Sequence, residues 1–486
     1  MTLNVSRRIS TIAAILTTVA NVFLLHSLYN KLDKEDVQQS NVHVQAARNS
    51  YYAEPVITTD VMSLFPEFKN VSPNDLKPVP FTQRNRVRKK LVVGIPVVER
   101  AKSYITDTLT SLFSRLDEVY RSEILFVVMF GSRRTFSGFV MNTTKEIKWK
   151  FAKEIDDGLL QIIAIPEAWY KINIEDVPPT FNDKAERMYW RTKQNIDYIY
   201  IMTYAGTLGD YYMQLEDDVI AADSYARVIF NYITFLGGRQ WFYMDFSRMG
   251  FIGKLFRTEE LKDVVHSVAL YYRYKPVDWI LLDIQYCRYC RPDQSMANCN
   301  KVIKAIVIGC GATQFQHVGK VSSLSGKVQN ISDKYFGKGK GWSSRNNPLA
   351  KVSSTMKCKS GYEPQRGYAN NNAIWFLNVA KGGRMIVTFS APITVTGIML
   401  LSGVPPAAQG KFGPETNVYV SLHGSDEANK TLLGAFSLNG DFLFRSCGTT
   451  VKSIEVEVTE DLLHDVVVDH FIIDTGVQEC LASNEK

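Results

Sequence analysis

The sequence predicts an α/β domain built on a parallel sheet, followed by an all-β sandwich and preceded by a membrane-spanning helix. Strand-like and helix-like segments alternate from about residue 90, and short strands separated by Gly, Pro and Asn turns follow residue 347. Near the N-terminus, residues 9–30 lack Asp, Glu, Lys and Arg. With 486 residues, 45% of them hydrophobic and 22% charged, the chain has the size and composition of a globular protein with two domains.

The uncharged run at residues 9–30, ISTIAAILTTVANVFLLHSLYN, is long enough to span a hydrocarbon core of about 30 Å. Arg7 and Arg8 precede it, so the positive-inside rule assigns residues 1–8 to the cytoplasm. A cleaved signal peptide is the alternative, but the run exceeds a usual signal core and no clear small-x-small cleavage site follows. We therefore expect an uncleaved signal anchor, with a lumenal stem at residues 31–85 whose second half is rich in proline.

The α/β domain is predicted to occupy residues 86–346. Its first strand, KKLVVGIPVV at residues 89–98, is continuously apolar, as expected of a strand buried on both faces. Further strands are predicted at residues 123–131 and 159–166, and helices at residues 103–120, 145–156 and 184–206. Strands separated by crossover helices imply a parallel sheet with helices on both faces, and ligands of such sheets bind beyond the carboxyl ends of the strands.

Residues 347–486 have a different pattern. The stretches RMIVTFSAPITVTGIMLL, TNVYVSLHG, KSIEVEVTE and DVVVDHFIID alternate apolar and polar residues between turn signals. This pattern predicts an antiparallel β-sandwich.

The stretch YYMQLEDDVI, residues 211–220, runs from a predicted buried strand directly into three carboxylates. Carboxylates this close repel one another, and burying them costs several kcal/mol unless a positive charge accompanies them. A solvated acidic loop is one interpretation, and a site for a divalent cation is the other. On a strand, Glu216 and Asp218 would share one face and Asp217 would take the other. Hard cations such as Mn²⁺ and Mg²⁺ take oxygen ligands of this kind, with a diphosphate completing the shell.

Two other features define the class of protein. The net charge of +7 is mild, and the basic stretch RNRVRKK at Arg84–Lys90 carries no interleaved aromatic residues, so we expect a linker and no nucleic-acid partner. Four of the seven cysteines cluster at Cys287, Cys290, Cys299 and Cys310. They fit either a zinc site or disulfides, and a lumenal compartment favours disulfides.

The chain resembles the N-acetylglucosaminyltransferase IV family, the alpha-1,3-mannosyl-glycoprotein 4-beta-N-acetylglucosaminyltransferases. The matching stretches, in family order over about residues 90–335, are VVGIPVVER, RTKQNIDY, YYMQLEDDV, GFIGKLF, KPVDW, FQHVG and SSLSGK. The resemblance implies a GT-A-type fold, UDP-GlcNAc as donor, a divalent metal (Mn²⁺ or Mg²⁺) and an N-glycan on a glycoprotein as acceptor. It also implies a carbohydrate-binding-module-like C-terminal domain and attachment to the Golgi membrane as a single-pass type II protein.

Carried onto this chain, the resemblance makes Asp218 the direct metal ligand of the acidic triplet, with Glu216 and Asp217 at the donor and Asp217 also a catalytic residue. Asp278 in KPVDW matches a family position and is the candidate general base on the acceptor hydroxyl. Its alternative role is a helix N-cap, because DWILLDI begins an apolar helical run. Asp283 is a weaker candidate, since it is shifted by one residue, or about 100° around a helix, from the usual family position.

Other candidate site residues carry open alternatives. His317 in FQHVG is a metal or diphosphate ligand, or else a hydrogen-bonded core histidine. Arg191 and Lys193 in RTKQN contact the diphosphate or the triplet, or are ordinary helix-surface cations. Gly94 and Pro96 are expected to shape the turn after the first strand, where a uridine ring would lie.

The family also implies a Cys290–Cys299 disulfide, while pairing of Cys287 with Cys310 stays open. In the C-terminal domain, the loop at residues 407–411 reads AAQGK where the family usually carries an acidic residue, so we expect weak or absent glycan binding there. Trp375 is either a sugar-stacking residue or part of a core strand.

With the resemblance, these features predict an inverting transferase that moves GlcNAc from UDP-GlcNAc to a mannose of an N-glycan. The beta-1,4 branch on the alpha-1,3 arm is implied by the resemblance alone. The alternative is a catalytically silent, Golgi-anchored glycan-binding or regulatory partner of another transferase. The retained carboxylates favour the enzyme, because a silent chain has no need to keep mutually repelling charges.

Overall fold

A computed structural model describes residues 59–476, apart from residues 86, 311–312, 322–323, 325–330, 334–335, 337–346, 371, 404–409 and 423–429. The predicted anchor at residues 9–30 lies outside these residues. Within the described ranges, no helix is long and apolar enough to cross a membrane.

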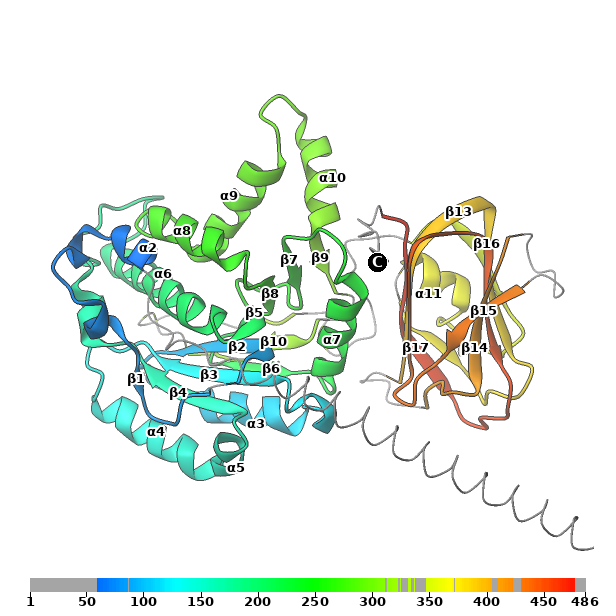
Figure 1. Cartoon of the computed structure of the whole chain (residues 1–486), viewed down its shortest axis with the longest axis horizontal. Coiled ribbons are helices and arrows are strands. Elements are labelled where there is room, and N and C mark those ends of the chain that lie inside the picture. The colour runs from blue at the N-terminus through cyan, green and yellow to red at the C-terminus, as the bar shows by residue number, and fades with distance from the viewer. Residues whose placement is uncertain are drawn as a thin grey trace, which may run out of the picture. The chain divides into compact units, whose positions relative to one another are not determined.

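An eight-stranded sheet in the order β1-β4-β3-β2-β5-β8-β7-β9 forms the centre of the α/β part (Figure 1). Its strands are β1 (Val79–Pro80), β2 (Lys89–Val97), β3 (Ile124–Phe130), β4 (Leu160–Ala164), β5 (Gly209–Gln214), β7 (Tyr243–Asp245), β8 (Lys254–Arg257) and β9 (Val307–Gly309). Strands β4, β3, β2 and β5 are parallel, as predicted, but β8 runs antiparallel to both β5 and β7. The expectation of a wholly parallel sheet is therefore wrong. The short connection between β7 and β8 leaves no room for the crossover that a parallel pair requires.

Helices cover both faces of this sheet. They are α2 (Thr59–Ser63), α3 (Ile105–Ser114), α4 (Gly138–Lys150), α5 (Ala152–Asp156), α6 (Ala185–Gly206), α7 (Tyr225–Leu236), α8 (Leu261–Tyr271), α9 (Val277–Tyr289) and α10 (Met296–Ile306), with 3₁₀ turns η1 (Pro66–Phe68), η2 (Pro73–Leu76), η3 (Glu118–Tyr120) and η4 (Glu167–Lys171). Alternate residues of β2 divide between two apolar cores: Leu91 and Val93 pack with α3, α4 and α7, whereas Val92 packs with α6, α8 and α9. The continuous apolar run of β2 thus marks a strand buried on both faces.

The predicted helix at residues 145–156 begins earlier and is interrupted. Ser137 caps α4 by accepting a hydrogen bond from the Val140 amide, and α4 ends before Phe151. A short separate helix, α5, follows. Serine is a common N-cap residue, so Ser137 in the sequence already indicates this earlier start of the helix.

A two-stranded antiparallel sheet, β6 (Val219–Ala221) with β10 (Phe315–His317), lies outside the main sheet in the pairing order. Its register pairs His317 with Val219, the residue that follows the acidic triplet. This pairing brings two segments that are far apart in the sequence to the end of β5.

The C-terminal part is a seven-stranded, wholly antiparallel sheet with a closed apolar core, as expected of a sandwich. Its elements are β11 (Ala350–Ser354), α11 (Pro364–Asn370), β12 (Ile374–Phe376), β13 (Arg384–Ser402), β14 (Thr416–Ser421), β15 (Lys430–Ala435), β16 (Asp441–Val458) and β17 (Val466–Asp474). The long strands β13 and β16 are irregular in register at two places, between Thr388 and Ile393 and between Val395 and Gly397. Such irregularities bend a strand and allow it to run around the core.

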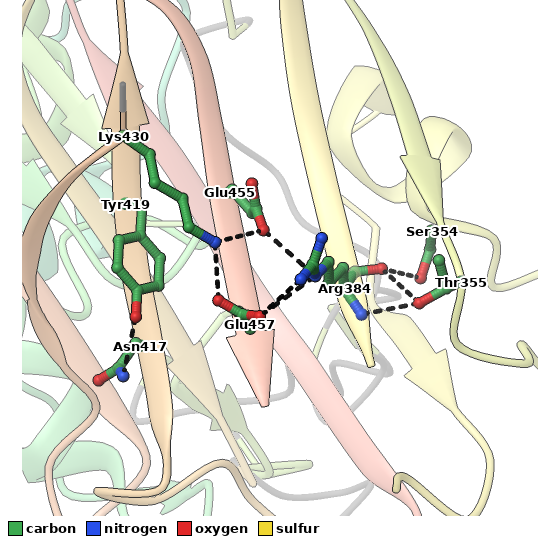
Figure 2. A network of polar contacts seen from close by, with 8 residues as sticks. All are labelled: Ser354, Thr355, Arg384, Asn417, Tyr419, Lys430, Glu455 and Glu457. Atoms are coloured by element: carbon green, nitrogen blue, oxygen red, sulfur yellow. Dashed lines mark hydrogen bonds and ion pairs between the residues drawn. The ribbon is translucent and has the colours of Figure 1, made fainter. Parts of the chain in front are cut away.

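A network of paired charges crosses this sheet (Figure 2). Lys430 on β15 donates to Glu455 (3.2 Å) and Glu457 (2.8 Å) on β16, and Arg384 on β13 donates to Glu457 (3.0 Å). The two glutamates alternate with Ile454 and Val456, which point into the core. Two carboxylates face two cations, so the charges of the network balance within the protein.

A disulfide joins Cys290, at the end of α9, to Cys299 in α10, which confirms the pairing implied by the family. The open pairing of Cys287 with Cys310 is not formed, because neither thiol takes part in a disulfide. Cys287 lies on the exposed side of α9, whereas Cys310 is fully buried beyond β9, so their side chains do not meet. With Cys290 and Cys299 oxidised, a zinc site in this cluster is excluded as well.

Candidate active site

The acidic triplet lies in the turn between β5, which ends at Gln214, and β6, which begins at Val219. Strand alternation therefore does not set the directions of its side chains, contrary to the expectation from sequence. Glu216 and Asp218 nevertheless converge: with His317 they bring one ligand atom each to within 4.8 Å of one another. Two carboxylates and an imidazole thus meet at the carboxyl end of β5.

Backbone contacts from neighbouring elements fix this turn. The Thr108 hydroxyl in α3 donates to the Asp217 carbonyl (2.8 Å) and accepts from the Val219 amide (3.1 Å). The Ser111 hydroxyl, one turn along α3, accepts from the Ala221 amide (2.9 Å). On the β10 side, the Val318 amide donates to the Asp218 carbonyl (2.9 Å). Because these groups are largely buried, the turn keeps its shape without support from solvent.

His317 and Gly319, both in the FQHVG motif, lie against Asp218. Nε2 of His317 is 3.3 Å from Oδ2 of Asp218, and the imidazole lines a cavity, which makes the core-histidine interpretation the weaker one. A Cβ atom at Gly319 would overlap the Asp218 carboxylate, so only glycine fits there. The motif therefore supplies an imidazole that can bind a metal and, at Gly319, the space that the Asp218 carboxylate occupies.

Arg100 is a residue of the candidate site that the sequence motifs did not identify. It follows β2, the strand next to β5, and its guanidinium donates to Asp217 and to Oδ2 of Asp218 (Nη1, 2.7 Å). Its side chain is only 7% exposed. The signal was available, because Arg100 closes the stretch VVGIPVVER and adjacent parallel strands end at the same edge of a sheet.

The three carboxyl groups of the triplet differ in the direction of their pKa shifts. Burial, with Asp218 nearby, raises the pKa of Glu216 to about 7, and burial raises the pKa of Asp217 to about 7 although Arg100 opposes the shift. Burial also acts on Asp218, but hydrogen bonds from His317 and Arg100 outweigh it and lower the pKa of that carboxyl. The hydrogen bond to Asp218 in turn raises the pKa of His317. Asp218 is therefore the permanent anion of the group.

A divalent cation fits this arrangement. Oδ1 of Asp218 is buried and has no hydrogen-bond partner among the described residues, which is an expensive state for a carboxylate oxygen. Carboxylates suit Mn²⁺ and Mg²⁺, and imidazole suits first-row transition metals, so the set formed by Glu216, Asp218 and His317 fits Mn²⁺ better than Mg²⁺.

A cavity of about 1360 Å³ opens onto the triplet. Of the residues singled out from the sequence, it is lined by Pro96, Lys193, Glu216, Asp217, Asp218, Asp278 and His317. Trp279, which is 42% exposed, also lines it. The cavity therefore joins the candidate metal ligands to the candidate base in one space.

The two cations of the RTKQN stretch are placed differently. Lys193 lines the cavity and donates to Asp197 (2.6 Å) and to the Gly131 carbonyl (2.8 Å). Arg191 is fully buried and donates to Asp183 (2.7 Å), and the structure does not bring it to the triplet. Of the two, only Lys193 stands beside the site.

Gly94 and Pro96 also differ in their position relative to the cavity. Both lie within β2, so neither forms the turn after the strand. A Cβ at Gly94 would meet the Tyr212 ring on β5, and the Gly94 carbonyl accepts from the Leu215 amide (2.9 Å), so Gly94 permits close pairing of the two strands. Pro96 lines the cavity.

Asp278 is not a helix cap. Helix α9 begins at Val277 with Pro276 as its N-cap, and no side chain caps it. Within the described part of the chain, the Asp278 carboxylate has no ion-pair or hydrogen-bond partner. The alternative candidate, Asp283, is held by Lys275 (2.6 Å) and does not line the cavity.

In the C-terminal part, Trp375 lies on β12 but is only half-buried. Its indole donates to Asp465 (2.9 Å), and the Lys359 ammonium lies 3.6 Å from its ring centre. The ring face is thus covered by a cation and is not a free stacking surface. Most of the loop at residues 407–411 is outside the described residues.

The fold and the site define a class: an α/β protein whose sheet carries a metal-competent acidic turn at the rim of a large cavity. Residues 56–336 match the family described as the MGAT4 conserved region, and the chain belongs to that family.

The chain is 35% identical over 331 residues to alpha-1,3-mannosyl-glycoprotein 4-beta-N-acetylglucosaminyltransferase A of Bos taurus, covering 68% of this chain and 61% of that protein. It is 33% identical over 331 residues to the B protein of Danio rerio, covering 68% and 60%. The match thus spans about three-fifths of each relative's length. Among solved structures, a chitosan-binding module from Paenibacillus matches 26% of this chain and 96% of its own, with 15% identity and a TM-score of 0.22.

We predict that Glu216 makes the metal-free protein less stable as the pH rises. Because its pKa is raised to about 7 from 4.5, the folded state keeps a proton that the unfolded chain has already lost. The stability contributed by this proton is fully present below about pH 4.5 and is lost as the pH rises through 7, and the part lost between pH 6 and pH 8 is on the order of 1 kcal/mol. Chemical unfolding of the wild type and Glu216→Gln at both pH values, without metal, should show a steeper loss in the wild type.

Glu186→Gln is the matched control, since Glu186 is exposed and lines the same cavity. It should keep the pH dependence of the wild type. Identical pH dependence in the wild type and Glu216→Gln would contradict the prediction.

Proposed function

We propose that this protein is an inverting, metal-dependent transferase that moves GlcNAc from UDP-GlcNAc to a mannose of an N-glycan. The product would be the beta-1,4 branch on the alpha-1,3 arm. The observation that carries the proposal is the convergence of Glu216, Asp218 and His317 at a cavity that also contains an unpaired Asp278. Family membership supports it, and the curated relatives are named for this reaction. The mixed sheet, with its acidic turn at a strand end, is consistent with a GT-A-type domain.

On the donor side, Glu216, Asp218 and His317 would hold the divalent cation, which supplies neutralisation of the charge that develops on the leaving diphosphate. Lys193 stands in the same cavity as a further positive group for that diphosphate. Pro96, at the end of β2, would border the nucleoside.

On the acceptor side, Asp278 would act as general base. The acceptor hydroxyl oxygen bonds to the anomeric carbon as the bond from that carbon to the diphosphate oxygen breaks on the opposite face, and the hydroxyl proton passes to Asp278. A carboxylate without a competing partner is suited to accept this proton. Displacement from the opposite face inverts the anomeric configuration.

An aromatic pair supports an acceptor site beside Asp278. The rings of Phe181 and Trp279 pack edge to face with centres 5.2 Å apart, and the Arg191 guanidinium lies 5.7 Å from the Phe181 ring centre. Phe181 adopts φ of +57°, a region that bulky residues rarely occupy, so its neighbours must hold it there. An exposed indole fixed in this way is a suitable surface for the apolar face of a sugar ring.

The alternative, a catalytically silent, anchored glycan-binding or regulatory partner of another transferase, is not favoured by the family match. It predicts that the purified protein transfers no GlcNAc to any N-glycan, whether or not it binds UDP.

We propose a single-pass type II location in the Golgi membrane, based on the uncharged run at residues 9–30 and the two arginines before it. The anchor should remain attached, so mass spectrometry of the mature protein should recover peptides from residues 1–30. A mature N-terminus between about residues 25 and 50 would mean that the segment is a cleaved signal peptide.

Asp218→Asn and Asp278→Asn should separate the two halves of the reaction. Asp218→Asn removes the permanent anion, so UDP binding that depends on Mn²⁺ should fall sharply. Asp278→Asn should keep UDP and Mn²⁺ binding while turnover drops by about 100-fold or more. Calorimetric UDP titrations with Mn²⁺, beside transfer assays on a panel of N-glycans, measure both effects.

Asp283→Asn is the control for the base, because Asp283 is paired with Lys275 outside the cavity. Its turnover should stay near that of the wild type. Unchanged Mn²⁺-dependent UDP binding in Asp218→Asn would refute the metal site, and absence of transfer by the wild type would favour the silent partner.

Trp279→Ala should raise the KM for the glycan acceptor by about fivefold, because a stacking surface worth roughly 1 kcal/mol is lost. UDP affinity should not change. Tyr286→Ala is the control: Tyr286 is an exposed aromatic residue of the same helix that does not line the cavity. Equal acceptor KM values in Trp279→Ala and the wild type would exclude the indole from the acceptor site.

A further inference from the structure

Arg100 is bonded to one of the carboxylates that would hold a cation. Its Nη1 donates to Oδ2 of Asp218 at 2.7 Å, and the same oxygen is 3.3 Å from Nε2 of His317. Its other terminal nitrogen donates to Asp217. The guanidinium is thus bonded to a carboxylate that belongs to the cluster of Glu216, Asp218 and His317.

Acidic groups outnumber cationic ones around Arg100. Three carboxyl groups, at Glu216, Asp217 and Asp218, lie beside one guanidinium and one imidazole in the described part of the site. In the C-terminal network, by contrast, Glu455 and Glu457 face two cations, Arg384 and Lys430. The first group needs further positive charge, and the second does not.

The hydrogen bonds of Arg100 to the acidic triplet do not use its whole guanidinium, so the side chain can dissociate from the triplet at a limited cost. Nε of its guanidinium is buried without a hydrogen-bond partner among the described residues, so the triplet satisfies only part of the group. Its side chain lines the cavity, where a second anion would lie within reach. The planar fork that fits two carboxylates fits two oxygens of a diphosphate equally well.

We propose that Arg100 is an exchangeable counter-ion. It pairs with Asp217 and Asp218 when no divalent cation is bound, withdraws from Asp218 when a cation binds there, and then pairs with the nucleotide diphosphate. Cation and nucleotide binding are thereby coupled through one side chain: the cation releases the arginine that the diphosphate needs. The diphosphate step rests on the proposed function, whereas competition between Arg100 and the cation rests on the geometry of the triplet alone.

A permanent structural ion pair is the opposing account. In that case Arg100 would stay on Asp217 and Asp218 in every state, and its removal would weaken the site for cations by loosening the turn. The two accounts predict opposite signs for the change in cation affinity.

The test is Mn²⁺ binding, measured by electron paramagnetic resonance on the full chain with and without UDP. Arg100→Gln should bind Mn²⁺ about tenfold more tightly than the wild type when UDP is absent, since a competing cation has been removed. The gain in Mn²⁺ affinity that UDP confers on the wild type should shrink by about tenfold or more in the variant. By linkage, UDP affinity at saturating Mn²⁺ should fall correspondingly.

Arg133→Gln is the matched control. Arg133 lines the same cavity, is paired with Glu175, and has a side chain that is 45% exposed. Its loss removes one positive charge from the cavity without touching the triplet, so Mn²⁺ affinity and its dependence on UDP should both stay near wild type.

Arg100→Lys keeps the positive charge but loses the planar pair of guanidinium donors. It is the variant to measure if Arg100→Gln does not fold. It should show near wild-type Mn²⁺ affinity without UDP and a reduced effect of UDP. Unchanged or weaker Mn²⁺ binding in Arg100→Gln, or an undiminished UDP effect in Arg100→Lys, overturns the inference while leaving the proposed transferase intact. If the wild type itself binds no Mn²⁺ at millimolar concentration, the metal site and the inference both fail.

Discussion

Three consecutive carboxylates in a buried turn are the constraint on which the rest of this site depends. Glu216, Asp217 and Asp218 repel one another and lose hydration at the end of β5, so the surrounding structure has to compensate. Arg100 and His317 provide the charge and the hydrogen bonds, and α3 fixes the backbone through Thr108. The compensation is incomplete, because one oxygen of Asp218 is still unpartnered among the described residues. This unpartnered oxygen supports the proposed cation site, and it contrasts with the C-terminal ion network, whose charges balance.

The sheet topology explains why these groups meet. Strands β2 and β5 are parallel neighbours, so Arg100 after one and the triplet after the other emerge at the same edge. Pairing of β10 with β6 then brings His317 from nearly one hundred residues further along the chain. The first turn of α9 adds Asp278 and Trp279 to the same cavity. The proposed donor and acceptor sites therefore share one cavity, as transfer between two substrates requires.

The C-terminal sheet also carries paired carboxylates and cations, but there the pairs stabilise the fold. On β16, glutamates alternate with core residues, and the two glutamates are neutralised by Arg384 of β13 and Lys430 of β15 (Figure 2). Trp375, the residue there with the side chain best suited to stack on a sugar, is covered by Lys359 and tied to Asp465. Its polar groups are satisfied internally, which is the pattern of residues that stabilise a fold.

The sequence by itself determined the elements whose patterns are local. The apolar run of β2, the amphipathic α6, the alternating strands after residue 347 and the acidic stretch after β5 were all evident, because burial and period depend on neighbours along the chain. Short family motifs also located Asp278 and His317. The resemblance, not the spacing of the residues, supplied the Cys290–Cys299 pair.

Only the tertiary structure decided how those elements combine. The antiparallel position of β8, the turn that replaces a strand at the triplet, and the separation of Lys193 from Arg191 depend on contacts between segments distant in sequence. The same is true of Arg100, because its two carboxylate partners lie more than one hundred residues away in the sequence. Electrostatic partners are chosen by distance in space, and a linear sequence does not contain that distance.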